Sequence, residues 1–394
     1  MTEQQTGLIS LIRSALTGQA CFLPASFDLP AALHEAKRHG IIALAFYGAC
    51  HCGVDPSCEE MKTMFSLVCK CIAAAGQQDA EISILTETLE AHGIEYMPLK
   101  GALLRKVFPK PEMRMMGDVD ILIKTEQYPA IRPLMLELEY EESVVSDHEF
   151  NWHKPSLHVE LHRRLIPSYN KDYYAYFGDG WKLASRIGTS CRFHMSPEDE
   201  LIYLFTHFAK HYRDSGIGLR HPLDIWAFEQ EHPDLNRAYL QTELTKLQLW
   251  DFYCNVHRTL DVWFRDAAPD EITDAITDTI FHSGQYGRRE TSQLSSSLKE
   301  RKNTPNSFLR KIKQLSLSVF TPYETMCKRY PVLVRHPYLL PFFWVVFFFR
   351  RLTNRERMTA YAERQHAVTT EQVSAYQQAL NQVGLDFNFG DGAT

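Results

Sequence analysis

The apolar residues of this chain change their spacing twice, and these two changes most constrain its fold. Up to residue 92 they recur at a helical period, as in Ile82, Leu85 and Leu89. Between residues 94 and 195, the segments VDILI (119–123) and LHVELH (157–162) have the composition or the alternation of strands. From Ser196 onward the helical spacing returns. This order predicts an α+β fold in which a small mixed β-sheet lies within a large helical surround.

The same changes divide the chain into regions. A length of 394 residues suggests two or three domains or lobes. We expect an N-terminal helical region over 1–92, an α/β core over 93–195, a helical lobe over 196–290 and a C-terminal helical region over 291–394. One helix is predicted over 236–264, and the serine-rich, charged stretch 292–306 is the best candidate for a linker.

Composition excludes several classes of protein. Apolar residues make up 45% of the chain, which is ample for a core and excludes global disorder. The net charge of −6 makes nucleic acid an unexpected partner. The nine cysteines include C-x-C pairs but no C-x2-C pair of the zinc-binding kind, and the N-terminus does not resemble a signal peptide. Free thiols and a cytoplasmic location are therefore expected.

The segment YLLPFFWVVFFF (338–349) is almost wholly apolar. Its 12 residues are too few to cross a bilayer as a helix, which takes about 20. Residues 299–364 contain 14 Lys and Arg side chains against 4 Glu, so the apolar segment lies in a basic region. One interpretation is peripheral contact with an anionic membrane surface through residues 338–351. The other is a buried helix with solvated flanks.

Two carboxylates two residues apart mark the clearest candidate site. Asp118 and Asp120 stand on one face of the expected strand, because side chains alternate across a strand. Such a pair is costly unless a cation neutralises it, and oxygen ligands of this kind suit Mg²⁺. Upstream, Gly101 lies between a strand and a helix, where the backbone can approach a phosphate, and Lys100 adds a cation. Together these parts indicate phosphoryl or nucleotidyl transfer.

Glu160 is the best candidate for a third carboxylate. It lies in the alternating strand 157–162 and shares a face with His158 and His162. In a two-metal site, a third acid helps to hold the catalytic metal and orients or deprotonates the attacking hydroxyl. His158, Glu160 and His162 could instead form a transition-metal site, because imidazole and carboxylate suit Zn²⁺ or Fe²⁺. A third interpretation is an exposed polar strand face.

The order of these motifs resembles the uncharacterised nucleotidyltransferase family of the DNA-polymerase-β-like superfamily over residues 30–265. Most of that superfamily has Gly-Ser where this chain has Lys100-Gly101. The resemblance implies a nucleotidyltransferase core in which Asp118, Asp120 and Glu160 are catalytic and bind metal. It also implies that Lys100, Gly101 and Arg114 lie near the nucleotide phosphates. It extends to a downstream group of polar residues: His207, Lys210, His211, Arg220 and Asp224.

These downstream residues also fit a helical lobe beside the sheet. His207 and His211 lie one turn apart on a helix, with Lys210 adjacent, and Arg220 and Asp224 have the same spacing. His207, Lys210, His211 and Arg220 could contact phosphates or base. The alternative is a packed network between lobes in which Arg220 and Asp224 form an ion pair.

The expected reaction is Mg²⁺-dependent transfer of a nucleoside monophosphate from a nucleoside triphosphate, with ATP the expected donor. The acceptor is a hydroxyl or phosphate of an unidentified small molecule or protein, because the superfamily's fold serves many acceptors. Two other classes stay open. One is a non-catalytic nucleotide-binding regulatory protein with the same fold, and the other is a metalloenzyme built on the His and Glu residues of strand 157–162.

Overall fold

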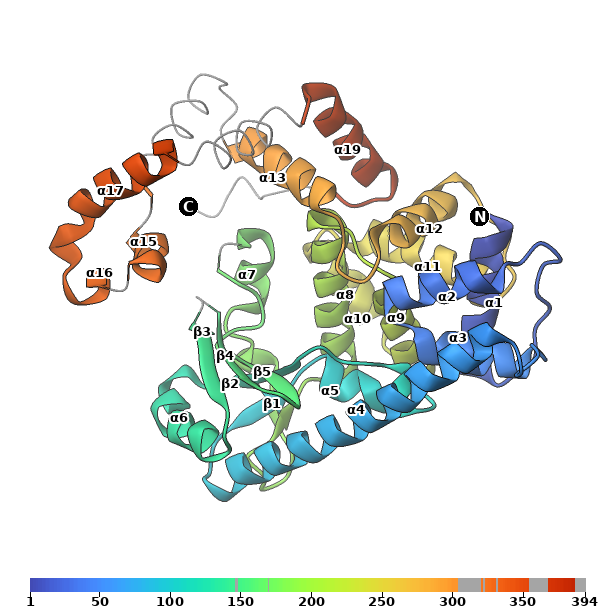
Figure 1. The fold of residues 1–394 in the computed structure, drawn as a ribbon, viewed down its shortest axis with the longest axis horizontal. Helices are drawn as coiled ribbons and strands as arrows, with labels where there is room; N and C mark the ends of the chain where they lie inside the picture. Colours follow the sequence, from blue (N-terminus) through green and yellow to red (C-terminus); the bar gives the residue numbers. More distant parts are fainter. Residues whose placement is uncertain are drawn as a thin grey trace. The chain divides into compact units, whose positions relative to one another are not determined.

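A computed structural model describes residues 1–145, 148–168, 170–303, 320–321, 323–330, 332–353 and 368–386 (Figure 1). The chain forms two compact units. The first comprises Met1–Arg288 and the chain from Gln382 onward, and the second comprises Arg289–Asn381. The fold is α+β with a helical surround, as the spacing of apolar residues predicts.

The first unit begins with four helices: α1 (Glu3–Thr17), α2 (Leu29–His39), α3 (Ile42–His51) and α4 (Glu59–Ala91). At the start of α1, the Thr2 side chain accepts from the Gln5 backbone while the Gln5 side chain accepts from the Thr2 backbone, which satisfies two N–H groups that the helix leaves free. The long helix α4 ends where His92 and Gly93 follow it, and Gly93 has a φ of 68°. The helical spacing that the sequence shows up to residue 92 thus ends with the end of a helix.

Five strands form the main sheet: β1 (Tyr96–Pro98), β2 (Val119–Ile123), β3 (Glu141–Val145), β4 (Glu149–Lys154) and β5 (Leu157–His162). Their order is β1-β2-β5-β4-β3. Strands β2 and β5 pair in parallel, whereas the other pairs are antiparallel, so the sheet is mixed as predicted. The parallel register places Asp120 opposite Glu160.

The two faces of this sheet differ in chemistry because residues alternate along each strand. On one face, Val119 and Ile121 of β2 and Val159 and Leu161 of β5 pack in a core with helices α4 and α6 (Tyr128–Glu137). The intervening residues, which include Asp120 and Glu160, therefore point to the opposite face. This alternation is what places carboxylates together on one side of a buried sheet.

Short elements lie between the strands of the main sheet and between its last strand and a helical lobe. They are α5 (Gly101–Leu104), η1 (Arg105–Val107), η2 (Pro111–Met113), η3 (Thr125–Gln127), α7 (Lys171–Phe177), η4 (Trp181–Leu183) and the two-stranded sheet of β6 (Ser185–Arg186) and β7 (Phe193–His194). The lobe consists of α8 (Pro197–Asp214), α9 (Arg220–Glu231), α10 (Arg237–Lys246), α11 (Trp250–Phe264) and α12 (Glu271–Ser283). Its core includes a cluster of aromatic rings from α8 and α11: Phe205, Phe208, Phe252 and Tyr253.

The single helix predicted over 236–264 is wrong, because the chain forms α10 and α11 with a break between them. At the break, Gln248 adopts a φ of 57°, which a continuous helix does not allow. Leu247 and Leu249 on either side are buried, so the apolar spacing continues through the break and conceals it in the sequence.

The second unit contains α13 (Arg289–Asn303), α15 (Tyr323–Arg329), α16 (Val332–Arg335), η5 (Pro337–Leu339), α17 (Leu340–Thr353) and most of α19 (Thr370–Gln382). The linker predicted over 292–306 is wrong up to residue 303, where the chain is helical, and its last residues lie outside the described part of the chain. Across the described residues, none of the helices combines the length and the apolar character needed to span a bilayer.

Candidate active site

The turn between β1 and α5 brings a lysine to the polar face of the sheet. Lys100 adopts a φ of 39°, a conformation that is strained for any residue except glycine. Its Nζ donates to Asp120 Oδ1 at 2.8 Å, so the turn directs this cation onto the carboxylates. Gly101 follows in a confined position, because an added Cβ would lie 2.8 Å from Met116 Sδ and 3.1 Å from Arg114 Nη1. A side chain at this position would therefore displace the wall of the site.

Carboxylates from two neighbouring strands lie side by side. Asp120 and Glu160 are register partners in the parallel pair β2–β5, and Asp118 precedes β2 by one residue. Burial opposes ionisation of Asp120, but hydrogen bonds and charge from Lys100 and His162 hold its pKa well below the usual range. Burial, followed by the charges of Asp120 and Glu160, raises the pKa of Asp118. The site therefore carries excess negative charge that favours a cation.

A histidine completes the tightest group of possible metal ligands. Ligand atoms of Asp120, Glu160 and His162 lie within 4.8 Å of one another, and this group could hold a metal ion. His162 Nε2 lies 2.8 Å from Asp120 Oδ1 and 3.4 Å from Glu160 Oε2. Burial lowers the pKa of His162, but these two hydrogen bonds outweigh it and raise the pKa overall.

The group of Asp120, Glu160 and His162 differs from both sets of metal ligands that the sequence predicts. Asp118 lines the same cavity but is not part of the 4.8 Å group. The alternative set on strand 157–162 is not brought together in this group, because His158 does not line the cavity and Asp120 stands with Glu160 and His162 instead. Residues two apart on a strand are separated by about 6.6 Å, so His158 and His162, four residues apart, diverge along β5.

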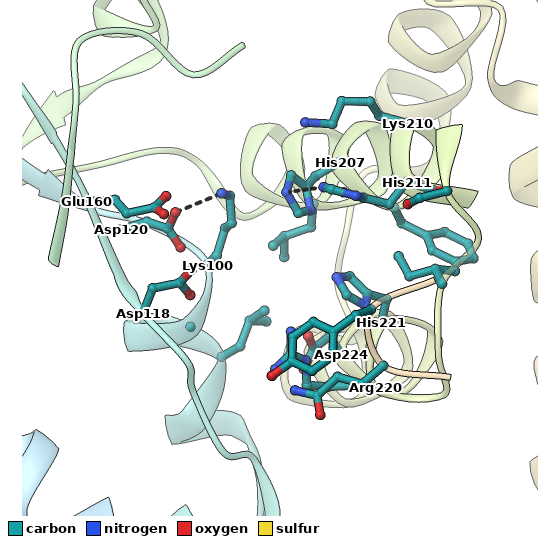
Figure 2. A pocket seen from close by; sticks show the side chains of 18 of the residues that line it. Lys100, Asp118, Asp120, Glu160, His207, Lys210, His211, Arg220, His221 and Asp224 are labelled. Carbon is teal, nitrogen blue, oxygen red and sulfur yellow. Dashed lines mark hydrogen bonds and ion pairs between the residues drawn. The ribbon is translucent and has the colours of Figure 1, made fainter. Parts of the chain in front are cut away.

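The opposite wall of the site carries imidazole and cationic groups from the helical lobe. Figure 2 shows His207, Lys210 and His211 on one helix and Arg220 and His221 on the next, across from the carboxylates. The Nε2 atoms of His207 and His211 lie 3.1 Å apart, so one ring donates to the other. Burial first, then Lys210 and Lys100, lower the pKa of His211 to about 3. The pKa of His207 is lowered well below its usual value for the same main reason, so both rings are neutral at pH 7.

Arg220 on this wall has unused capacity to bind an anion. Its Nη1 donates weakly to the Met115 carbonyl at 3.4 Å, and its Nε has no hydrogen-bond partner among the described residues. Burial, followed by the nearby Arg114, lowers the pKa of Arg220. An unpartnered guanidinium nitrogen beside other cations is suited to a phosphate oxygen.

Arg114 and Asp224 form a buried ion pair between the loop before β2 and helix α9. Arg114 Nε donates to Asp224 Oδ1 at 3.0 Å and Nη2 donates to Oδ2 at 2.9 Å. Both side chains are at most 7% exposed. The pair predicted between Arg220 and Asp224 is therefore replaced, because the carboxylate of Asp224 is taken by a residue 110 positions earlier in the chain.

All of these groups line one cavity of about 440 Å³. The catalytic and phosphate-binding residues that the family resemblance implies all lie on its wall: Lys100, Gly101, Arg114, Asp118, Asp120, Glu160, His207, Lys210, His211 and Arg220. Asp118, Asp120 and Glu160 lie on one side together with Lys100, and His207, Lys210, His211 and Arg220 lie on the other (Figure 2). An arrangement of carboxylates facing donors of positive charge can hold a divalent cation together with an anionic, phosphate-bearing ligand.

A family model described as "Uncharacterised nucleotidyltransferase" matches residues 25–265. The chain belongs to this family. Comparison with curated proteins and with solved structures gives no match. The match includes both walls of the cavity up to Asp224 and ends before the loop that follows α12.

Sequence reasoning missed three groups in the cavity of this nucleotidyltransferase. His221 follows Arg220 directly, and its Nδ1 is buried without a partner among the described residues. His148 and Glu149 form an ion pair at 2.8 Å at the cavity's edge. Tyr286 lines the cavity although its side chain is 86% exposed, and it lies beyond the family match. The sequence offered a signal only for His221, which directly follows the nominated residue Arg220.

Proposed function

We propose that this protein transfers a nucleoside monophosphate from a nucleoside triphosphate, with ATP the expected donor, to an acceptor hydroxyl or phosphate. The observation that carries the proposal is the cavity itself, in which Asp118, Asp120 and Glu160 face Lys210 and Arg220. Membership of a nucleotidyltransferase family supports the same reaction class. The acceptor's identity is left open, because the fold serves many acceptors.

The carboxylate wall fits divalent cations. Asp118, Asp120 and Glu160 would hold two Mg²⁺ ions, and His162 would keep the last two carboxylates oriented through its hydrogen bonds. Bound there, Mg²⁺ would neutralise charge on the phosphates and on the attacking oxygen. Lys100 now bonds to Asp120 and could exchange that partner for a phosphate oxygen, because a lysine carries three donors.

The opposite wall fits the triphosphate. Arg220 and Lys210 would contact phosphate oxygens. Of the neutral rings of His207 and His211, the one that accepts in their mutual hydrogen bond keeps its own N–H and would donate it without adding charge. Glycine at position 101 lets Met116 and Arg114 pack against the start of α5, where a Cβ would displace them. Arg114 would act indirectly: its ion pair with Asp224 would hold helix α9, and therefore Arg220, in place.

Tyr286 would provide a stacking platform for the nucleobase. It belongs to the loop after α12, which is fixed by bonds from Gln285 N to the Arg38 carbonyl at 3.0 Å and from Arg288 N to the Ser215 carbonyl at 2.6 Å. Gly287, with a φ of 72°, packs so closely on Ser215 that no side chain fits there. A rigid loop thus presents an exposed aromatic ring at the cavity, and base–aromatic stacking is worth about 1–3 kcal/mol.

The chemical step balances without any further reactant. The acceptor oxygen forms a bond to the α-phosphorus as the bond to the bridging β-phosphate oxygen breaks, and pyrophosphate leaves with that electron pair. When the acceptor is a hydroxyl, its proton passes to Glu160, which lies on the cavity wall beside Asp120.

The test combines binding with product analysis. Calorimetry should show that the Asp118→Asn/Asp120→Asn variant loses Mg²⁺-dependent ATP binding, whereas the control Asp234→Asn/Asp251→Asn keeps it, because those two acids are exposed and lie away from the cavity. Equal affinity in the acid variant would contradict the metal assignment. Incubation with each labelled nucleoside triphosphate, Mg²⁺ and cell extract should then place label on a protein, RNA or small-molecule fraction.

A non-catalytic nucleotide-binding regulator with the same cavity is the second candidate. It predicts tight Mg²⁺-ATP binding that depends on the same acids, but no release of pyrophosphate with any acceptor fraction. Pyrophosphate release that disappears in the Glu160→Gln variant would reject this candidate and support transfer. A cytoplasmic site of action is proposed with the function, and nucleic acid is the least expected acceptor given the net charge of −6.

A further inference from the structure

Helix α17 has a face that packs within the second unit. Trp344 Nε1 donates to the Thr321 carbonyl at 2.7 Å, and its ring meets Phe320 edge-on with centroids 5.1 Å apart. Phe343 packs on Tyr330 with ring centroids 4.6 Å apart. Nearby, Met326 of α15 and Leu333 of α16 are buried. One side of α17 is therefore accounted for by contacts with α15, its neighbours and η5.

The other side of α17 is equally apolar, and no described residue buries it. Tyr338, Phe342 and Val345 are 73%, 62% and 53% exposed. Their spacing of four and three residues places them in one stripe, continuous from η5 into α17. Of the described side chains over 340–347, all apolar, not one is buried. A surface helix in water is expected to be polar on its outer face, so an exposed apolar stripe indicates a binding surface.

The charge of the sequence on both sides of the stripe indicates the kind of partner. Residues 299–364 carry 14 Lys and Arg side chains against 4 Glu and no Asp, although the whole chain has a net charge of −6. Arg350, which follows the apolar run of α17, is exposed. An aromatic-rich apolar helix face within a basic segment matches the interface of an anionic lipid bilayer, where rings sit at headgroup level and cations meet phosphates.

We propose that η5 and α17 dock on an anionic membrane surface, with Tyr338, Phe342 and Val345 inserted and the helix lying in the interface. The helix is too short to cross a bilayer, which agrees with the absence of a membrane-spanning helix among the described residues. Such docking would bring the protein to acceptors at the membrane surface. It is independent of the proposed transfer reaction, because it rests on the second unit alone.

The test is co-sedimentation of the full-length protein with vesicles of phosphatidylcholine alone or mixed with phosphatidylglycerol. The wild type should pellet with the mixed vesicles at low salt, pellet little with the neutral ones, and be released as salt rises, because surface charge is screened. The Phe342→Asp/Val345→Asp variant should bind the mixed vesicles at least tenfold more weakly. Its circular dichroism should match the wild type, since both side chains are exposed.

A matched control separates the stripe from general surface apolarity. Ile84 of α4 and Leu136 of α6 are 48% and 49% exposed, so Ile84→Asp/Leu136→Asp removes comparable apolar surface elsewhere. This control should bind vesicles as the wild type does. The proposal is overturned if the wild type stays in the supernatant, if neutral vesicles bind equally well, or if the control loses as much binding as the stripe variant. It is also overturned if the stripe variant merely dissociates a dimer, which would make a second copy the occupant.

Discussion

Replacing Asp224 with leucine should loosen helix α9 far more than replacing Arg114 and Asp224 together. The two side chains form a bidentate pair at 3.0 and 2.9 Å and are at most 7% exposed. Removing one partner leaves the other charge buried and unpaired, which costs about 3–5 kcal/mol. The Arg114→Met/Asp224→Leu variant has no such charge and should cost less than either single change. Arg114→Met should be the milder single variant, because Arg220 lies one turn from Asp224.

Hydrogen exchange of α9 measures this effect locally, which suits a chain of two units. A loss of about 3–5 kcal/mol corresponds to exchange that is roughly two to three and a half orders of magnitude faster for the α9 amides in Asp224→Leu. Amides of α6, on the far side of the sheet's core, should change little. Exchange in the double variant as fast as in Asp224→Leu would refute the reasoning, because it would show that packing, and not an orphaned charge, sets the cost.

The same double variant separates two roles for Arg114. If Arg114 supports α9 through Asp224, the apolar pair keeps the wall in place and ATP affinity should stay within a factor of about three. If Arg114 contacts phosphates, as the family resemblance implies, the loss of a charge-assisted hydrogen bond should weaken ATP binding by roughly tenfold or more. Calorimetry on the wild type and the double variant decides between them.

Three further predictions concern single residues. His39 is fully buried and accepts a hydrogen bond from Leu219 N, and burial lowers its pKa to about 4. Because the unfolded chain binds a proton at this histidine more readily than the folded chain does, its contribution to stability should be complete above about pH 6.5 and fall by about 3 kcal/mol as the pH drops to 4. Thermal melts of His39→Gln should show a weaker dependence of stability on pH over this range. Tyr286→Ala should weaken ATP binding roughly tenfold or more in calorimetry, whereas Tyr286→Phe should bind ATP as the wild type does. Binding of tripolyphosphate, which has no base, should be the same in Tyr286→Ala and the wild type, and equal losses of affinity for ATP and tripolyphosphate would reject stacking. Lys100→Gly should unfold at higher urea concentration than Lys100→Ala, because glycine relieves a strained φ worth about 1–3 kcal/mol, and identical midpoints would show that the turn is unstrained.

The carboxylate-bearing face of the sheet was predictable because it follows from local alternation. Asp118 and Asp120 precede and enter β2, and the alternation of β5 turns Glu160 to the same side. What the sequence left open was the pairing of the two strands. The parallel register, in which Asp120 lies opposite Glu160, depends on the core that forms beneath both strands.

The missed features depend on contacts between residues far apart in the chain. One of the two interpretations paired Asp224 with Arg220, four residues away, but Asp224 accepts two hydrogen bonds from Arg114, 110 residues earlier. Tyr286 enters the cavity because its loop is bonded to Arg38 and Ser215, which no local pattern indicates. Spacing rules find residues that share an element, whereas these residues meet because separate elements pack.

Charge balance in the cavity supports the need for divalent cations. Five carboxylates line it against four lysine or arginine side chains. The rings of His207 and His211 add no charge, because burial keeps them neutral. Counted without the histidines, the acids and the lysine and arginine side chains of the lining carry a net charge of −1 before any ligand enters. A nucleoside triphosphate would then add several negative charges to a buried site, where an uncompensated charge is costly. Divalent cations that arrive with the nucleotide are the simplest source of the missing charge, so binding of ATP without them should be weak.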